Sequence, residues 1–182
     1  MSVPGVYRRL IPLAAGGFAV GCFLTFGIAA NAQGTASMGY VLGSSEGEHL
    51  IQRDGNIFIK VQPDRGSGNL AVGTQQVLAG VGIPMHRHID MDEAFYVIDG
   101  SGTVVLNDSP HSIQKGDSIF IPKNSWHAFQ NPNSELLLLW IAVPPHLAAF
   151  FREFAARPGM PPVQRTKEQM NELAGKYGTQ FR

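Results

Sequence analysis

A chain of 182 residues is long enough to form one domain with its own hydrophobic core, and 44% hydrophobic residues is an ordinary share for a globular protein. The 14 basic and 14 acidic side chains cancel, and the basic ones are scattered along the chain. No nucleic-acid partner is therefore expected, because a phosphate-binding surface needs clustered Lys and Arg. The 21 glycines and 12 prolines favour a turn-rich β fold over a helical one.

The start of the chain has the pattern of an export signal. Arg8 and Arg9 precede an uncharged apolar stretch, residues 10–30, and an Ala-Asn-Ala sequence follows, as expected before a cleavage site. We predict a signal peptide over residues 1–32 and a mature protein that is periplasmic or secreted, with membrane contact only through the signal. The alternative interpretation is an uncleaved anchor, because the apolar run approaches the length that spans a bilayer.

Two further features of this segment bear on the mature protein. The residues around the two arginines weakly resemble a twin-arginine signal, so both export routes stay open, and those around Cys22 weakly resemble a lipoprotein site. Cys22 is the only cysteine and lies within the predicted signal. The mature chain should then have no disulfide and no thiolate metal ligand, so its stability must come from burial.

After the signal, short β-type runs alternate with turn residues. Residues 33–46 are predicted to be a flexible leader, because the first of them are small and polar. Turn residues at 54–56 and 63–68 separate the strands. The predicted strands cover residues 40–42, 48–51, 57–61 and 70–78. The last strand contains Gln75 and Gln76, and we expect one of them to face the interior, with a solvated outer face as the alternative.

Three histidines and one glutamate are candidate metal ligands. Alternate side chains share a face in an extended chain, so His86 and His88 point the same way, and Glu93 opens the next strand at residues 93–98. His127 follows a second turn, from which it could close the set. Imidazoles and a carboxylate suit a divalent ion such as iron, manganese, nickel, copper, cobalt or zinc. An isolated His-x-His pair is more often structural, so the prediction depends on all four residues.

The residues around these ligands resemble the two sequence motifs of the cupin family. The first consensus, G-x5-H-x-H-x4-E-x6-G, is matched by Gly80, His86, His88, Glu93 and Gly100. The second, G-x5-P-x-G-x2-H-x3-N, is matched by Gly116, Pro122, His127 and Asn131. Asn124 departs from it by replacing the usual Gly, but Asn is the non-Gly residue that best tolerates a left-handed backbone. The resemblance implies an all-β double-stranded β-helix (jelly-roll) barrel over residues 47–145, with a metal in its mouth on these four candidate ligands.

Strand alternation also assigns the neighbours of the ligands. The residues predicted to face inward with them are Phe95, Val97, Phe129 and Asn131. Tyr96 and Trp126 alternate with this set and should face away, which makes them weak site candidates. Met85 and Phe120 are predicted to be packing residues and not catalytic ones. His49 and His111 are predicted to be surface or structural residues.

The end of the chain is predicted to cover the barrel. Residues 136–143 are nearly all apolar and predict a strand buried on both sides, which could also form a homodimer contact. A C-terminal helical extension, residues 146–182, should follow. It should hold an amphipathic helix at residues 146–157 and a second helix, opened by a capping box at Thr166, that ends at Ala174. Residues 175–182 are expected to be a tail.

Several functions are compatible with the resemblance. Four protein ligands leave one or two positions on the ion for water, dioxygen or a small-molecule substrate, and Glu93 could also leave the ion and accept a proton, which makes it the candidate catalytic residue. The motifs and helical extension are similar to flavonol-dioxygenase-like cupins, which implies oxidative cleavage of a small oxygenated, flavonol- or diketone-like compound. A non-catalytic ligand-binding or sensing cupin and a non-oxidative lyase or isomerase are the alternatives.

Overall fold

The computed structural model describes residues 38–53, 55–131 and 133–182. The predicted signal peptide and the first residues of the predicted leader lie outside this part of the chain. Within it, no helix combines the length and the apolar character that crossing a bilayer requires.

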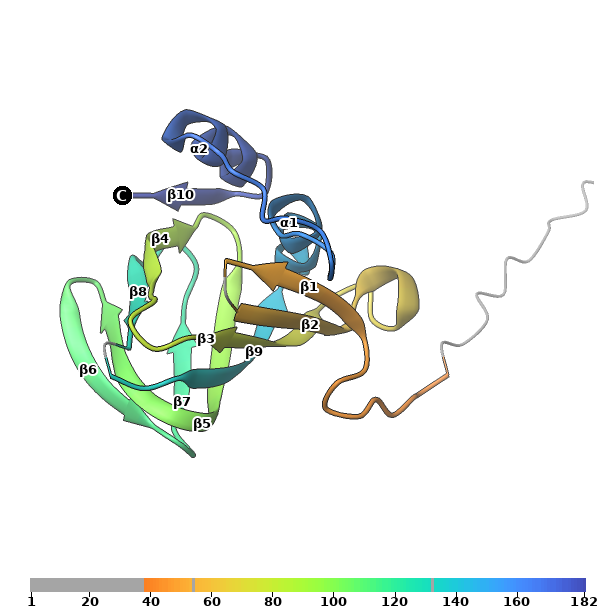
Figure 1. The fold of residues 1–182 in the computed structure, drawn as a ribbon, viewed down its shortest axis with the longest axis horizontal. Coiled ribbons are helices and arrows are strands. Elements are labelled where there is room, and N and C mark those ends of the chain that lie inside the picture. The colour runs from red at the N-terminus through yellow and green to blue at the C-terminus, as the bar shows by residue number, and fades with distance from the viewer. Residues whose placement is uncertain (1–37, 54, 132) are drawn as a thin grey trace, which may run out of the picture. The chain divides into compact units, whose positions relative to one another are not determined.

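Antiparallel strands are the main regular structure of the described chain, as Figure 1 shows. They are β1 (Glu48–Gln52), β2 (Gly55–Val61), β3 (Ala71–Val77), β4 (Ile83–His88), β5 (Asp92–Leu106), β6 (Ser109–Gln114), β7 (Ser118–Ile121), β8 (His127–Gln130), β9 (Leu136–Val143) and β10 (Thr179–Phe181). Their order in the sheet is β1-β2-β3-β9-β5-β8-β4-β10, and β6 and β7 also pair with β5.

The long strand β5 makes the sheet curl. Its first half pairs with β7 and β9, and its second half pairs with β6 and β8. Gly100 lies at the change between these partners with φ 87°, and a Cβ atom there would lie 1.8 Å from the carbonyl oxygen of Glu135. Only glycine fits this position. The resulting curled antiparallel sheet confirms the predicted jelly-roll fold (Figure 1).

The core lies on the inner face of the sheet, and β9 illustrates how the sequence fills it. Leu136, Leu138 and Trp140 are fully buried, and the residues that alternate with them are half-buried. The prediction of a strand buried on both sides is therefore wrong for its outer face. Each large apolar side chain buried in this way contributes about 1.5–3 kcal/mol of transfer free energy.

Two helices follow the last long strand, beside a short 3-10 helix earlier in the chain (Pro63–Arg65). Helix α1 (His146–Phe154) contacts β1, β3 and β9, and its Phe151 ring lies 5.5 Å from Trp140, measured between centroids. Helix α2 (Lys167–Lys176) contacts α1 and β10, and the predicted capping box at its start is confirmed. Helix α1 ends earlier than predicted because Ala156 pairs in extended conformation with Ile51 of β1.

Three sequence-based predictions are wrong in this part of the chain. Residues 40–42 are not a strand, and the hydroxyl of Tyr40 donates to the carbonyl oxygen of Lys60 instead. Phe120 is 63% exposed, because alternation along β7 turns Ile119 and Ile121 inward and Phe120 outward. The expected tail forms β10, which pairs with β4.

Candidate metal centre

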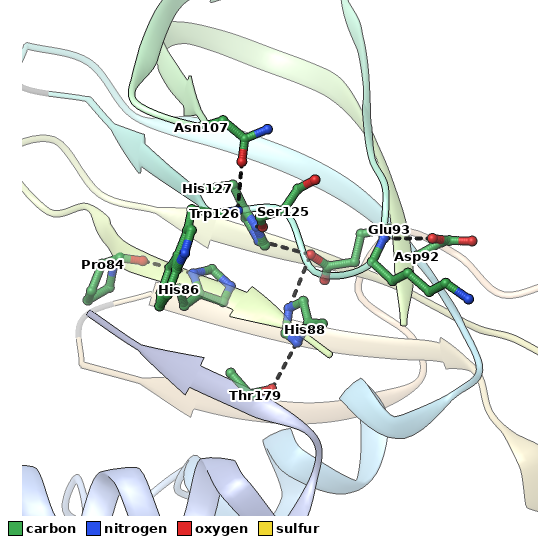
Figure 2. Close-up of polar contacts among 11 residues, drawn as sticks. Pro84, His86, His88, Asp92, Glu93, Asn107, Ser125, Trp126, His127 and Thr179 are labelled. Atoms are coloured by element: carbon green, nitrogen blue, oxygen red, sulfur yellow. Dashed lines mark hydrogen bonds and ion pairs between the residues drawn. The ribbon is translucent and has the colours of Figure 1, made fainter. Parts of the chain in front are cut away.

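The fold brings the four candidate ligands to one point, as Figure 2 shows. His86 and His88 lie on β4, Glu93 lies at the start of β5, and His127 opens β8 directly opposite His86. The four residues are buried, with 9%, 3%, 3% and 0% exposure in that order. One ligand atom from each lies within 4.8 Å of all the others. The prediction that a β fold unites these side chains is confirmed.

Two of the histidines are oriented by carbonyl groups close to them in sequence. Nδ1 of His86 donates to the carbonyl oxygen of Pro84 at 2.8 Å, and Nδ1 of His127 donates to that of Ser125 at 2.9 Å (Figure 2). A carbonyl oxygen can only accept, so Nδ1 must carry the hydrogen in both rings. In the neutral ring, Nε2 then presents a lone pair to the centre. For His88, Nδ1 lies 2.8 Å from Oγ1 of Thr179.

The lone pairs at the centre face one another. Oε2 of Glu93 lies 3.1 Å from Nε2 of His127 and 3.2 Å from Nε2 of His88, and these three buried atoms have no hydrogen-bond partner. Each unsatisfied buried polar atom costs about 1–3 kcal/mol. A single shared proton would satisfy one N···O pair, whereas one divalent ion would satisfy all the converging atoms. The side chains therefore fit a metal ion of the kind that nitrogen and oxygen ligands prefer.

The electrostatics of the cluster favour the protonation states that a metal needs. Burial, followed by the neighbouring His127 and His88, lowers the pKa of His86 from 6.5 to about 3. Burial alone would raise the pKa of Glu93, but the nearby His88 and His127 outweigh it and hold that pKa well below its ordinary value. A neutral imidazole and an ionised carboxylate are the forms that bind metal, because a bound proton competes with the ion.

The cluster forms part of the wall of a cavity of about 590 Å³. His86, His88 and Glu93 line this cavity. The aromatic residues that line it are Phe95, Phe129, Phe150, Phe151, Phe154 and Phe181. The cavity therefore offers a small organic molecule a mostly apolar wall beside a polar centre, as ligand sites generally do.

Gln75 is the inward-facing residue of the two neighbouring glutamines, which confirms that one of them faces the interior. It is 7% exposed and lines the cavity, and its Nε2 donates to Oε1 of Gln52 at 3.3 Å. Gln76 instead accepts from the side chain of Asn56 and donates to Glu135. Gln75 can therefore offer a hydrogen bond to a ligand in the cavity.

The inward neighbours of the ligands lie where alternation predicts. The buried residues of this set are Phe95, Val97, Phe129 and Asn131. Asn131 has a structural role, because its Nδ2 contacts the carbonyl oxygens of Val77, Leu78 and Ser134 at 2.6–3.1 Å.

The remaining candidates lie outside the centre, as expected. Tyr96 is 46% exposed, and Trp126 stacks with the guanidinium groups of Arg87 and Arg182. The other histidines considered are His49, which bonds to Asn56 and stacks on Phe58, and His111, which is exposed on β6.

Asn124, which replaces the glycine of the second motif, keeps the required turn. Its φ is 66°, in the left-handed region that asparagine was predicted to tolerate. Its backbone N–H donates to the carbonyl oxygen of His88 at 2.5 Å. With Asn124 in place of glycine, a backbone hydrogen bond therefore still joins the loop before β8 to the end of β4, the strand that carries two candidate ligands.

Thr179 and the aromatic side chains of α1 in the cavity wall were missed as site residues. The Phe spacing in α1 indicated only a helix packed on the barrel. Thr179 lies in the segment predicted to be a tail, and its alternation with Gln180 and Phe181 was the one available signal. Three residues are too few for such a pattern to predict a strand.

Comparison with known proteins agrees with the fold and the motifs. Residues 73–144 match the family model of the cupin domain. The uncharacterized protein MJ1618 of Methanocaldococcus jannaschii is 29% identical over 103 residues, which cover 53% of this chain and 79% of that protein. Quercetin 2,3-dioxygenase of Bacillus subtilis is 26% identical over 113 residues, which cover 62% of this chain and 34% of the enzyme.

A solved structure extends the likeness to three dimensions. The polyketide cyclase RemF of Streptomyces resistomycificus superposes with a TM-score of 0.54 and 20% identity, and the match covers 72% of this chain and 90% of the cyclase. At that identity the likeness concerns the fold alone. Residues 73–144 are thus similar to the cupin domain, and they include a buried cluster that could hold a metal ion.

Proposed function

We propose that this protein is an exported, metal-dependent cupin enzyme that cleaves a small oxygenated compound, such as a flavonol or a diketone, with dioxygen. The observation that carries the proposal is the set of buried, unpaired ligand atoms at the wall of an apolar cavity. The similarity to quercetin 2,3-dioxygenase supports oxidative cleavage as the reaction class. It is partial support, because the chain spans about one third of that enzyme's length.

His86, His88, Glu93 and His127 would hold the metal, which is one of iron, manganese, nickel, copper, cobalt or zinc. A redox-active ion bound there would supply Lewis acidity and an electron-transfer couple to the reaction. The aromatic side chains of the wall would exclude water and hold a flat apolar substrate against the centre.

Glu93 is the candidate to move a proton. Among the described residues that line the cavity it is the only acidic side chain, and it is held ionised. A substrate hydroxyl that approaches the centre would lose its proton to a carboxylate oxygen of Glu93. The amide of Gln75 would hydrogen-bond a second oxygen atom of the substrate and so fix its orientation.

The test uses the mature chain, residues 33–182, purified after export by its own signal. Its metal content is measured by elemental mass spectrometry, and oxygen uptake is followed with a panel of flavonols, diketones and catechols. We expect a redox-active divalent ion and oxygen consumption with at least one compound. The matched control is Glu93→Gln, which keeps the size of the side chain but removes its charge and should abolish turnover.

Each other outcome points to a different function. Bound metal with ligand binding but no turnover contradicts the enzyme proposal and favours a binding or sensing cupin. A product formed without oxygen consumption contradicts oxidative cleavage and favours a lyase or isomerase. No bound metal contradicts the whole proposal.

Export and self-association stay predictions that two simple measurements address. The intact mass of the protein recovered from the periplasm or medium should correspond to a chain that begins at Gln33. Light scattering after size exclusion should give twice the chain mass if the apolar outer face of β9 forms a homodimer. A chain that retains residues 1–32 would contradict cleavage of the signal.

A further inference from the structure

The last strand of the chain lies directly against the strand that carries two candidate ligands. In the antiparallel pair of β10 with β4, Thr179 lies opposite His88 and Phe181 lies opposite His86. Backbone hydrogen bonds continue past both ends of this pair, from Ile89 N–H to the Gly178 carbonyl at 2.8 Å and from Arg182 N–H to the Met85 carbonyl at 3.1 Å. The C-terminal residues are therefore held against the segment from Met85 to Ile89, which contains both candidate ligands of β4.

The side chains of β10 divide into an inner and an outer set. Thr179 is 3% exposed, and Phe181 lies with its ring centroid 5.7 Å from that of His86. Gln180, between them, is exposed and accepts hydrogen bonds from the guanidinium group of Arg87. The inner set thus contacts the candidate ligands, and the outer set does not.

The three histidines differ in the partner of Nδ1. His86 and His127 each donate to the carbonyl oxygen two residues before them, so their local turns fix the rings. His88 has instead the hydroxyl of Thr179 at 2.8 Å, a residue 91 positions away in sequence (Figure 2). Only tertiary structure can supply this partner, and it reaches His88 from outside both cupin motifs.

We propose that Thr179 is a positioning residue that holds His88 as a ligand, so that the C-terminal strand is part of the metal centre; this rests on the proposed metal-binding function. Oγ1 of Thr179 accepts the Nδ1 hydrogen of His88, which leaves the lone pair on Nε2 free for a metal ion that would bind at the centre. Partners of this kind fix the tautomer and the ring orientation, and their loss typically weakens metal binding by about 10–100-fold.

The hydroxyl, and not the shape of the side chain, is the element that matters. Valine in place of Thr179 keeps the branched shape and removes the acceptor, so the buried Nδ1 hydrogen of His88 would lose its partner. The ring could then turn or exchange tautomers, and Nε2 would no longer be held toward the centre. Serine keeps the acceptor and loses only a methyl group.

The experiment measures Co²⁺ affinity by competition with a chromophoric chelator, in the full mature chain and in three variants. We expect Thr179→Val to bind Co²⁺ about 10–100-fold more weakly. Thr179→Ser should bind within a few-fold of the parent protein, and Gln180→Ala, the matched control on the outer face of β10, should bind like the parent. The visible spectrum of bound Co²⁺ should change in Thr179→Val alone, because it reports the ligand geometry.

Three results would overturn the inference. They are equal affinity of Thr179→Val and the parent, equal weakening by Thr179→Ser and Thr179→Val, and equal weakening by Gln180→Ala. The last two would show that packing or strand pairing, and not the hydroxyl, supports the site.

A second measurement separates this inference from the proposed function. If the parent protein binds no metal, the proposed function fails, and nitrogen-15 NMR of the metal-free protein decides whether Thr179 positions His88. We expect His88 to carry its hydrogen on Nδ1 in the parent and to shift toward a mixture of tautomers in Thr179→Val. Hydrogen on Nε2 in the parent, or identical spectra in both proteins, would overturn the positioning role.

Discussion

Asn131 and the candidate metal centre both consist of buried polar side chains from the same pair of motifs. They differ in how their hydrogen-bonding atoms are used. Nδ2 of Asn131 contacts three backbone carbonyl oxygens from two segments, and one acceptor atom, Oδ1, is left over. In the candidate metal centre, Glu93, His88 and His127 turn unpaired atoms toward one common point.

The difference separates a structural role from a functional one. Asn131 uses its donors to join chain segments, so its removal should affect folding. The centre keeps converging lone pairs that only a bound cation can satisfy, so the loss of one of its residues should affect ligand binding. A mutation of Asn131 should therefore lower the free energy of unfolding and leave metal affinity unchanged. A mutation in the metal centre should lower metal affinity and leave the fold intact.

The largest effect is expected from His88→Ala. The loss of one of four ligands should lower metal affinity by more than about 100-fold, because loss of a ligand's hydrogen-bond partner alone costs up to that much. The metal-free protein should stay folded, because the substitution also removes one of the opposed lone pairs. Elemental analysis and circular dichroism measure the two quantities, with His111→Ala on the exposed β6 as control; unchanged metal content would refute the ligand assignment.

Asn131→Ala should give the reverse pattern. It removes the amide group whose two hydrogens are shared among three backbone carbonyl oxygens, and at about 0.5–1.5 kcal/mol for each hydrogen bond the free energy of unfolding should fall by about 1–3 kcal/mol. Metal affinity of the folded variant should not change. Urea unfolding of the metal-free protein checks the first expectation, and loss of metal binding without loss of stability would contradict the distinction between the two groups.

The pH dependence of the metal-free protein tests the electrostatics of the centre. The pKa of His86 is lowered from 6.5 in the unfolded chain to about 3 in the folded protein, so the unfolded state binds more protons between these values. Stability should therefore be greatest above pH 6.5 and fall as the pH decreases toward 3. The lowered pKa of Glu93 acts in the same direction at acid pH.

Urea midpoints at several pH values, in the parent protein and in His86→Ala, measure this dependence. The midpoint of the parent should fall more steeply with acid than that of the variant. Parallel curves would mean that the folded state does not lower the pKa of His86.

The smallest effect is expected from Tyr96→Phe. The side chain of Tyr96 lies on the outer face of β5 and is half-exposed, so it cannot reach the centre. Loss of its hydroxyl should change stability by less than about 0.5 kcal/mol and leave metal affinity unchanged. A large loss of metal binding would show that the alternation assigned to β5 is wrong.

The features of the fold that could be predicted are those whose sequence patterns span only a few residues. The period of two along a strand placed Phe95 and Val97 on the face of Glu93, and the motif spacing predicted the four candidate ligands. The capping box of α2 was equally local, because Thr166 and Gln169 lie within one helical turn. Phe120 was predicted to be a packing residue, although the same alternation turns it outward on β7.

By itself the sequence determined which side chains could meet a metal and which strand faces they occupy, because those properties follow from spacings of a few residues. Only the tertiary structure decided that Thr179 would complete the surroundings of His88 and that the aromatic residues of α1 would line the cavity. The physical reason is that β10 is three residues long. A segment so short has no stable conformation of its own, and its structure comes from pairing with a strand about ninety residues earlier in the chain.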